Sequence, residues 1–298
     1  MEILNHLAES LAGATLALGV FDGLHRGHQA VIEAARADGK KLGVLTFDPH
    51  PARVLAPERA PKRLLSSLPH QKRLLNGMGV ETLVVLPFTP ERAAQEAEDF
   101  AGELRACVLS AVAVGADWSF GRGRRGTVEK LATCLPDTEV KGVPAVCEAG
   151  RRISSTWIRE CLGRSDLAMA RQLLGRSFSV YGEVVKGRQL GRQLGFPTAN
   201  LRIGEEYLPP DGVYAVRGDW GEGWQTGVAN VGRRPTVSAD GRRLLEVHFL
   251  ACGTPDLYGR WVEVSFEEKI RSERSFANVG ELRQQIEKDA ENARMLLI

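Results

Sequence analysis

The spacing of the apolar runs changes once along this chain of 298 residues, and that change limits the folds the chain can adopt. Before about Gly175, short apolar runs alternate with longer stretches of helical periodicity. Strands that alternate with helices predict βαβ units, and therefore a parallel sheet with helices on both faces. The expected strands are 15–20, 42–47, 82–87 and 111–115. The expected helices are 71–78, 93–109 and a helix in two pieces over 153–174.

After Gly175 the apolar runs become short and closely spaced, with glycine and proline turns between them, at 180–185, 213–216, 227–231, 244–250 and 261–266. This spacing predicts an antiparallel β-barrel. Asn278 and Glu281 have the spacing of a capping box, which predicts a closing helix. The sequence thus predicts an α/β domain over residues 1–176, similar to a Rossmann fold, and a barrel domain with a terminal helix over residues 177–298.

Composition excludes several classes of protein. No apolar run reaches the roughly 18 residues needed to cross a bilayer, and the amino terminus lacks the basic region of a signal peptide, so we expect a cytoplasmic protein. The net charge of +2 argues against a nucleic-acid partner. The five cysteines include no CxxC pair, so we expect reduced thiols in place of a zinc frame or a disulfide scaffold.

The segment LGVFDGLHRGH, residues 18–28, combines a strand end, a glycine turn and a helix start. In such a turn the free backbone N–H groups and the helix dipole point at an anion, so the segment predicts a nucleotide-phosphate site. Gly19, Gly23 and Gly27 leave room for the turn. His25 and His28 lie three residues apart on one face of the first helical turn, where they can donate hydrogen bonds to phosphate oxygens.

Two further segments of the first half have more than one interpretation. Ser154, Ser155 and Thr156 precede Arg159 at a predicted helix start, where hydroxyls either cap the helix or bind phosphate. The segment GRGRRG, residues 121–126, formally matches a dinucleotide-binding motif. We reject that match because bulky aromatic residues crowd the turn and arginines are atypical of it. The segment then remains a basic loop that either contacts phosphate or is solvated.

The second half contains a separate set of chemical residues. Glycines at 187, 191 and 195 allow a loop to wrap closely over a polyphosphate. Thr198 and Asn200 follow on one side of an extended segment, where a hydroxyl and an amide oxygen can ligate Mg²⁺. Glu246 and His248 alternate with apolar neighbours, so both side chains face the same side of a strand.

These segments resemble the bifunctional riboflavin kinase/FAD synthetases, whose first half belongs to the HxGH adenylyltransferase superfamily. The resemblance spans nearly the whole chain. It is carried by LGVFDGLHRGH, FDPHP at 47–51, GADWSFG at 115–121, ISSTWIR at 153–159, FPTAN at 196–200, LEVHF at 245–249 and KIRSERSF at 269–276.

For the first half, the resemblance implies transfer of AMP from ATP to the phosphate of FMN. His25 and His28 would stabilise the reacting phosphates. The implied nucleotide-binding residues are Gly19, Phe21, Gly27, Ser154, Ser155, Thr156 and Arg159, and the implied flavin-binding residues are Asp48, His50 and Asp117. The family commonly has Arg at Trp157 and Asn at Asp117. A carboxylate beside phosphates repels them unless a metal or an arginine intervenes.

For the second half, the resemblance implies a riboflavin kinase with ATP as co-substrate. Glu246 would be the general base for the riboflavin hydroxyl, and Thr198 and Asn200 would hold Mg²⁺. The implied phosphate-binding residues are Lys186, Gly187, Gly191 and Gly195, and the implied flavin-binding residues are Arg271 and Phe276.

The favoured hypothesis is a bifunctional enzyme that converts riboflavin to FMN and FMN to FAD, with riboflavin, FMN and ATP as its only partners apart from an allowed homo-oligomer. One alternative is a kinase whose first domain binds nucleotide with little catalysis. A second is a flavin carrier without enzymatic activity. A third places a zinc ion among His25, His28, Asp48 and His50.

Overall fold

The computed structural model describes residues 1–187, 191, 194–233, 243–250 and 256–297. The chain forms two compact units. The first contains Met1–Lys62 and Leu68–Ser154, and the second contains Arg63–Ser67 and Ser155–Ile298.

The first unit is built on a six-stranded parallel sheet in the order β1-β4-β3-β2-β5-β6. Its strands are β1 (Glu2–Leu4), β2 (Thr15–Leu18), β3 (Leu42–Asp48), β4 (Thr82–Pro87), β5 (Ala111–Gly115) and β6 (Glu139–Val143). The predicted parallel sheet is confirmed. The edge strands β1 and β6 were not predicted, because neither contains a continuous apolar run.

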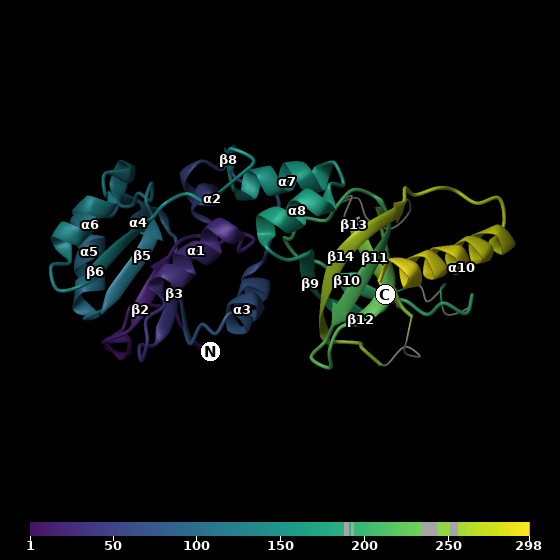
Figure 1. The fold of residues 1–298 in the computed structure, drawn as a ribbon, viewed down its shortest axis with the longest axis horizontal. Helices are drawn as coiled ribbons and strands as arrows, with labels where there is room; N and C mark the ends of the chain where they lie inside the picture. The colour runs from purple at the N-terminus through teal and green to yellow at the C-terminus, as the bar shows by residue number, and fades with distance from the viewer. Residues whose placement is uncertain (188–190, 192–193, 234–242, 251–255, 298) are drawn as a thin grey trace. The chain divides into compact units, whose positions relative to one another are not determined.

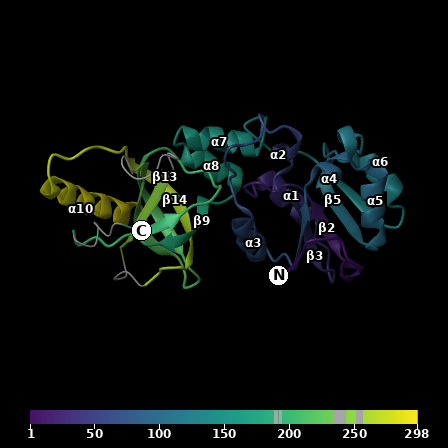
Figure 2. The same ribbon diagram turned by 180° about the vertical axis from the view of Figure 1, so that it is seen from behind.

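Helices cover both faces of this sheet, as predicted (Figure 1, Figure 2). Leu16 and Leu18 of β2 pack in a cluster with α5 (Ala97–Ala106) and α6 (Val128–Cys134). Ala17, between them, packs in the opposite cluster with α1 (Arg26–Ala35) and α3 (Leu68–Gly77). The remaining short elements are η1 (Glu9–Leu11), α2 (Pro51–Leu55), α4 (Pro90–Ala94), η2 (Arg122–Arg124), β7 (Cys147–Glu148) and β8 (Arg151–Arg152).

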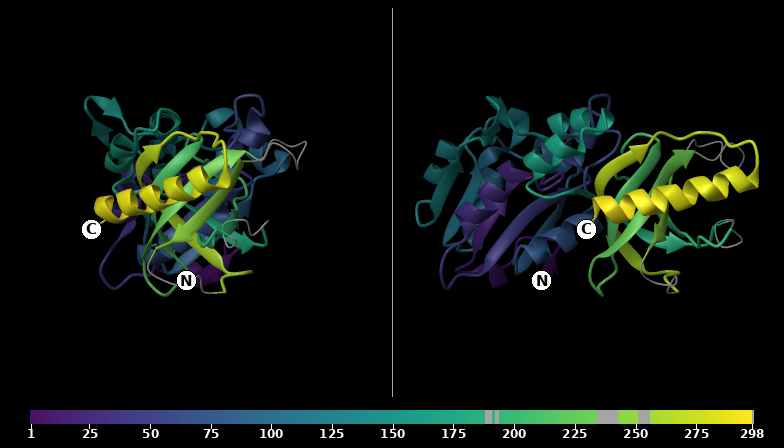
Figure 3. Two further views of the ribbon diagram at one scale, coloured as in Figure 1. Left: turned by 90° about the vertical axis from the view of Figure 1, so that its right-hand side faces the viewer. Right: turned by 45° about the vertical axis from the view of Figure 1, so that its right-hand side comes forward.

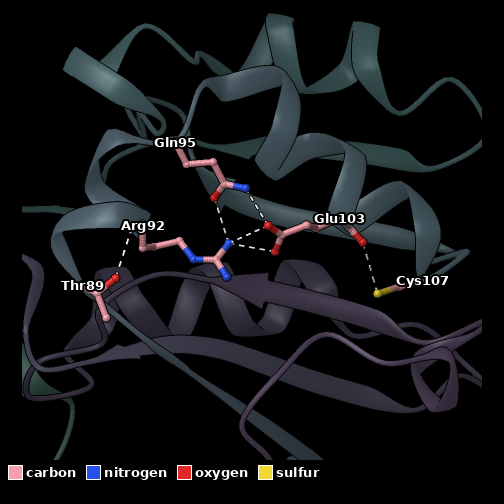
Figure 4. A network of polar contacts seen from close by, with 5 residues as sticks. All are labelled: Thr89, Arg92, Gln95, Glu103 and Cys107. Atoms are coloured by element: carbon pink, nitrogen blue, oxygen red, sulfur yellow. Dashed lines mark hydrogen bonds and ion pairs between the residues drawn. The ribbon is translucent and has the colours of Figure 1, made fainter.

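The single helix predicted over 93–109 is wrong: the chain forms α4 and α5 with a break at Gln95 and Glu96. Thr89 caps α4 by accepting from the Arg92 amide at 3.3 Å, which starts the helix before the apolar pattern begins. Gln95 and Glu96 then have extended backbone angles. The Gln95 side chain donates to Glu103 of α5 at 2.5 Å, so the break is stabilised from the following helix (Figure 4).

The second unit is a closed antiparallel barrel in the strand order β10-β13-β12-β11-β14-β9, as predicted. Its strands are β9 (Phe178–Val185), β10 (Ala199–Arg202), β11 (Gly212–Asp219), β12 (Gln225–Arg233), β13 (Arg243–Phe249) and β14 (Trp261–Arg271). The helix in two pieces is confirmed as α7 (Ser155–Gly163) and α8 (Leu167–Leu174).

The closing helix α10 (Val279–Leu296) lies across the outside of the barrel (Figure 3). Its predicted N-cap is confirmed, because Asn278 Oδ1 accepts from the Glu281 amide at 2.9 Å. The reciprocal bond differs from a capping box: Glu281 Oε2 accepts at 3.3 Å from the amide of Ala277, one residue before the cap. Ala293 and Leu297 pack on Ala215 of β11. The helix therefore begins at a defined residue and packs on the barrel through apolar side chains.

A short segment from the first half of the sequence, Arg63–Ser67, belongs to the second unit. The Ser67 amide and hydroxyl both donate to Glu206 Oε1, at 2.9 and 2.5 Å. The other oxygen of Glu206 accepts from the Tyr181 amide at 2.8 Å. These donors satisfy a carboxylate that is only 3% exposed.

The described part of the chain contains no helix long and apolar enough to cross a membrane. Cys107, Cys134, Cys147 and Cys161 are free thiols, as expected, and Cys252 lies outside the described residues.

Two candidate active sites

The first site is built on the turn between β2 and α1. Gly23 has a φ of 85°, and two residues with side chains, Phe21 and Leu24, also have positive φ values of 55° and 45°. Such angles cost about 1–3 kcal/mol per residue and persist where the surrounding structure enforces them. The Phe21 and Leu24 side chains are each 1% exposed, so burial of both side chains holds the turn in this conformation.

The histidine pair has a defined geometry. His25 is the N-cap of α1, and its Nδ1 accepts from the His28 amide at 3.3 Å. The two imidazole rings stack with centroids 3.6 Å apart, which confirms that they share one face of the turn. A Cβ at Gly27 would lie 3.2 Å from the His25 ring, so a larger residue would crowd it. Because Nδ1 accepts, the proton of a neutral His25 is on Nε2, which is then a donor.

His28 is set up as a neutral imidazole. Desolvation by burial lowers its pKa well below the ordinary histidine value, and the nearby charges of His25 and Arg152 lower the pKa further. Its ring packs edge-on against Phe21 with centroids 5.4 Å apart. Its buried Nδ1 has no hydrogen-bond partner among the described residues.

We expect His28 to titrate below pH 6.5 in the free protein. The unfolded chain then takes up the proton first, so this contribution to stability is present above pH 6.5 and is lost as the pH falls below it. An NMR titration measures the midpoint, with His28→Gln to assign the signal. Adding ATP should raise the midpoint, because the polyphosphate charge favours the imidazolium form. A midpoint at or above 6.5 in the free protein would contradict this description.

A cavity of about 620 Å³ lies at the carboxyl ends of the parallel strands in the same unit. One wall is a row of aromatic rings in successive contact. Phe88 meets Phe47 at 5.5 Å, Phe47 meets Phe100 at 6.5 Å, Phe100 meets Phe120 at 5.7 Å, and Phe120 stacks on Trp118 at 4.7 Å between centroids. Such a row fits a flat aromatic ligand.

Asp117 lines this cavity and is paired with an arginine. Both of its oxygens accept from Arg152 of β8, and the bond from Nη2 to Oδ1 is 3.0 Å. The hydrogen bond from Arg152 lowers the pKa of Asp117, so the carboxylate is ionised and its charge is compensated. Arg152 therefore compensates the negative charge that would otherwise make Asp117 repel a phosphate.

Two other expected flavin contacts, Asp48 and His50, follow β3. Asp48 is exposed at the end of the strand, and His50 caps α2 by accepting from the Ala52 amide at 3.1 Å. Neither residue lines the cavity. The zinc alternative requires at least three ligands together, and the described residues contain no such group.

The remaining predicted residues of this half lie in the turn after β2 and at the start of α7. Gly19 faces the Phe21 ring, which would lie 3.1 Å from an added Cβ. Ser154 ends the first unit, whereas Ser155, Thr156 and Arg159 lie in the first turns of α7 in the second unit. Trp157 is buried with 7% exposure.

The basic loop around Arg122–Arg124 is tied to its neighbours. The Arg122 amide donates to the Gln95 carbonyl at 2.7 Å, and its guanidinium pairs with Glu96 at 3.3 Å. Arg124 donates from Nε to Ser119 Oγ at 2.7 Å and lines the cavity.

The second site is a cavity of about 330 Å³ on the barrel, lined by Thr198, Glu246, Arg271 and Phe276, among others. Glu246 on β13 lies directly between Asn200 of β10 and Asn230 of β12 in the strand register. Its neighbours Leu245 and Val247 are fully buried, so Glu246 and His248 share the other face of β13, as predicted.

The glycine loop lies directly against the two predicted metal ligands. A Cβ at Gly187 would meet the Asn200 amide at 2.5 Å. At Gly191 it would meet the Phe196 carbonyl at 2.3 Å and Thr198 Oγ1 at 3.3 Å. Gly195 has a φ of 87°, and Lys186 is exposed at the end of β9. Residues 188–190 and 192–193 of this loop, and the segment 234–236, lie outside the described residues.

Sequence reasoning identified Arg271 and Phe276 but not their support. Arg271 makes a forked ion pair with Asp289 of α10, with three contacts between 2.8 and 3.0 Å. Its guanidinium also lies 5.7 Å from the Phe276 ring centroid. Asp289 and Asn230 line the cavity and were missed. The sequence could have indicated Asn230, because it is a polar residue between the apolar residues of a predicted strand. Asp289 had none, because its partner lies 18 residues earlier.

His248, to which sequence reasoning gave no role, has a defined contact. Its Nδ1 lies 2.9 Å from the carbonyl oxygen of Pro197, the residue before Thr198. A carbonyl only accepts, so Nδ1 carries the proton. His248 therefore ties the strand of Glu246 to the segment that contains Thr198.

Comparisons with known proteins agree with this division of the chain. Residues 7–157 match the family model for FAD synthetase, and residues 174–297 match that for riboflavin kinase. A crystal structure of a macrolide-efflux protein from Streptococcus pneumoniae superposes with a TM-score of 0.83 at 31% identity, covering 99% of both chains.

Curated relatives match along nearly the whole chain. The bifunctional riboflavin kinase/FMN adenylyltransferase of Escherichia coli (strain K12) is 40% identical over 95% of this chain and 92% of its own length. The protein of the same name from Bacillus subtilis (strain 168) is 35% identical over 96% of this chain and 93% of its own. This chain therefore belongs to the family of bifunctional riboflavin kinase/FMN adenylyltransferases.

Proposed function

We propose that this chain makes FAD in two ATP-dependent steps at two separate sites. In the first step the barrel half, about residues 177–298, phosphorylates riboflavin to FMN. In the second step the α/β half, about residues 1–176, transfers AMP from ATP to FMN and releases pyrophosphate. The main support is that each unit has its own cavity. Glu246, Thr198, Arg271 and Phe276 line the one on the barrel, and Asp117, Arg152 and the aromatic row line the one in the first unit. Both substrates and ATP are available in the cytoplasm, where we expect the enzyme to act.

In the kinase half, Glu246 is the general base. Its carboxylate faces the cavity and accepts the proton of the riboflavin 5′-hydroxyl as that oxygen attacks the γ-phosphate. Arg271 and Phe276 contact the flavin, and the Arg271–Asp289 pair fixes the guanidinium for this contact. Lys186 and the glycines at 187, 191 and 195 bind the ATP phosphates.

Thr198 and Asn200 suit Mg²⁺, because hydroxyl and amide oxygens are ligands that this ion accepts. The close approach of Gly187 and Gly191 to these two side chains supports this fit, since it puts the Asn200 amide and the Thr198 hydroxyl beside the glycine loop that would bind the ATP phosphates. When bound, Mg²⁺ would neutralise phosphate charge. Thr198 is itself held in place through Pro197 and His248.

In the adenylyltransferase half, catalysis needs positioning and charge stabilisation, because the FMN phosphate is already an anionic nucleophile. His25, with its proton on Nε2, and the neighbouring His28 donate to the reacting phosphates. Gly19, Phe21 and Gly27 shape the turn that receives the nucleotide. We assign Ser154, Ser155, Thr156 and Arg159 to the β- and γ-phosphates.

The flavin ring of FMN lies along the aromatic row of the larger cavity. The phosphate end then lies toward Asp117 and Arg152, because the charge of Arg152 reaches His28. Asp48 and His50 stay assigned to the flavin side of the site, at the end of β3.

Chromatography of two reactions tests this function. The purified protein is given ATP and Mg²⁺, with riboflavin in one tube and FMN in the other. We expect FAD from both tubes. FMN from the first tube without FAD from the second would restrict catalysis to the barrel half. Binding of flavin with no consumption of ATP would indicate a carrier and contradict both activities.

A further inference from the structure

An arginine of α4 is held at the wall of the larger cavity, which the aromatic row also lines. Arg92 lines the cavity four residues after Phe88, and its side chain is 23% exposed. Its Nη1 donates to both oxygens of Glu103, at 2.8 Å each, and to Gln95 Oε1 at 2.8 Å (Figure 4). Gln95 also donates to Glu103, so two mutually bonded side chains fix one end of the guanidinium.

The other edge of this guanidinium is available to a ligand. Within the described residues nothing accepts from Nε or Nη2 of Arg92, and Figure 4 shows Nη2 pointing away from Glu103 and Gln95. A guanidinium is planar and presents its donors in a rigid fork, so fixing Nη1 also fixes the direction of the remaining donors. Arg92 therefore offers a preorganised, charged donor edge to an acceptor in the cavity.

The order of the aromatic row indicates which part of the ligand reaches Arg92. Trp118 is at one end of the row, next in sequence to Asp117, which pairs with Arg152. Phe88 is at the other end, just before α4. If the FMN phosphate lies toward Arg152, as proposed above, the ring lies along the row, in the cavity that Arg92 also lines.

The two ends of a flavin ring differ in chemistry. The benzene end has methyl groups and cannot accept a hydrogen bond, whereas the pyrimidine end has two carbonyl oxygens. We propose that Arg92 is a specificity-determining residue for the adenylyltransferase, which donates to a carbonyl oxygen at the pyrimidine edge of FMN. This inference depends on the proposed function. Glu103 and Gln95 are positioning residues that act through Arg92.

Replacing Arg92 by methionine removes the donors and keeps an apolar side chain of similar length. We expect the KM for FMN to rise about 10- to 100-fold, the range for a lost hydrogen bond from a charged donor. The KM for ATP in the same reaction should stay unchanged. Riboflavin phosphorylation in the barrel should also stay unchanged. The KM for ATP is the control for an intact adenylyltransferase site, and thermal unfolding is the control for an intact protein.

Arg92→Lys is the second variant, because lysine retains a charge for Glu103 but not the second donor edge of the fork. If Arg92→Met does not fold because Glu103 has lost its partner, Arg92→Lys still tests the inference. We expect Arg92→Lys to keep the kinase activity and to show most of the rise in the KM for FMN. An unchanged KM for FMN in this folded variant would overturn the inference.

Analogues of FMN test whether Arg92 recognises the pyrimidine edge of the flavin ring. Sulfur is a poorer acceptor than oxygen, so 2-thio-FMN or 4-thio-FMN should bind the wild-type protein more weakly than FMN does. This penalty should vanish in both Arg92 variants, because the donor is already gone. An equal penalty in wild type and variants, or no penalty in wild type, would overturn the assignment.

Lumiflavin, which has the ring without a phosphate, separates ring recognition from phosphate recognition. As a competitor of FMN adenylylation, its inhibition constant should rise in Arg92→Lys by the same factor as the KM for FMN. An unchanged constant would show that Arg92 binds the phosphate, and would overturn the inference. A wild-type protein that makes no FAD from FMN would refute the proposed adenylyltransferase itself, which is a different result from any of these.

Discussion

Glu246→Gln is expected to abolish FMN formation from riboflavin, while FAD formation from supplied FMN continues. Glutamine has the same shape but cannot accept the hydroxyl proton, so the loss should be at least about 10²- to 10⁴-fold in kcat. Residue 246 is paired with Asn200 and Asn230 through the backbone register of the strands, so the barrel around it should persist. Both activities are measured by chromatography of the flavin products.

A matched control for this variant is Glu183→Gln on the adjacent part of the barrel. Glu183 lies on β9, pairs with Arg202 and does not line the cavity. An ion pair between partly exposed groups contributes about 0–1 kcal/mol, so this change should leave both activities intact. The assignment of Glu246 fails if the variant still makes FMN at the wild-type rate. Separate sites are refuted if a folded Glu246→Gln protein loses both reactions.

His28→Ala should have the opposite effect: FAD formation falls and riboflavin phosphorylation stays. The loss of one preorganised donor to a developing charge lowers kcat by about 10²- to 10³-fold. The turn itself should survive, because His25 caps α1 through the backbone amide of His28 and not through its side chain. For this reason His28 is a cleaner test than His25, whose replacement also removes the cap at a cost of about 1 kcal/mol.

His6→Ala is the control for His28, since His6 is exposed near the amino terminus and away from the cavity. Thermal unfolding of both variants checks that the fold is intact. If His28→Ala made FAD as fast as the wild-type protein, the stacked pair would be structural. The phosphate charge would then have to be stabilised by other residues, such as Arg152.

The sequence predicted the architecture because hydrophobic periodicity records which faces are buried. Leu16 and Leu18 pack on one face of the sheet and Ala17 on the other, and the continuous apolar run that such a doubly buried strand needs is visible in the sequence. The strand β6 was missed because its Glu-Val-Lys-Gly-Val segment contains no apolar run. The break between α4 and α5 was also missed, because it depends on Gln95 reaching a carboxylate eight residues later.

The candidate sites were predicted where the residues are close in sequence. His25 and His28 are neighbours along the chain, so the geometry of one helical turn brings them together. The support for Asp117 comes from Arg152, 35 residues later, and no periodicity relates the two. Arg92 was not identified at all, because its role depends on a cavity built from several strand ends. Long-range partners of this kind require the tertiary structure.

The segment Arg63–Ser67 has a consequence for how the protein can be divided. Its partner Glu206 lies 139 residues after Ser67, so the barrel unit is assembled from two pieces of chain with most of the α/β unit between them. A fragment that begins at residue 155 or later would lack both Ser67 donors. It would leave a nearly buried carboxylate short of hydrogen bonds, at a cost of about 1–3 kcal/mol for each lost donor. A single break in the chain therefore cannot separate the two enzymes without loss of stability in the barrel unit.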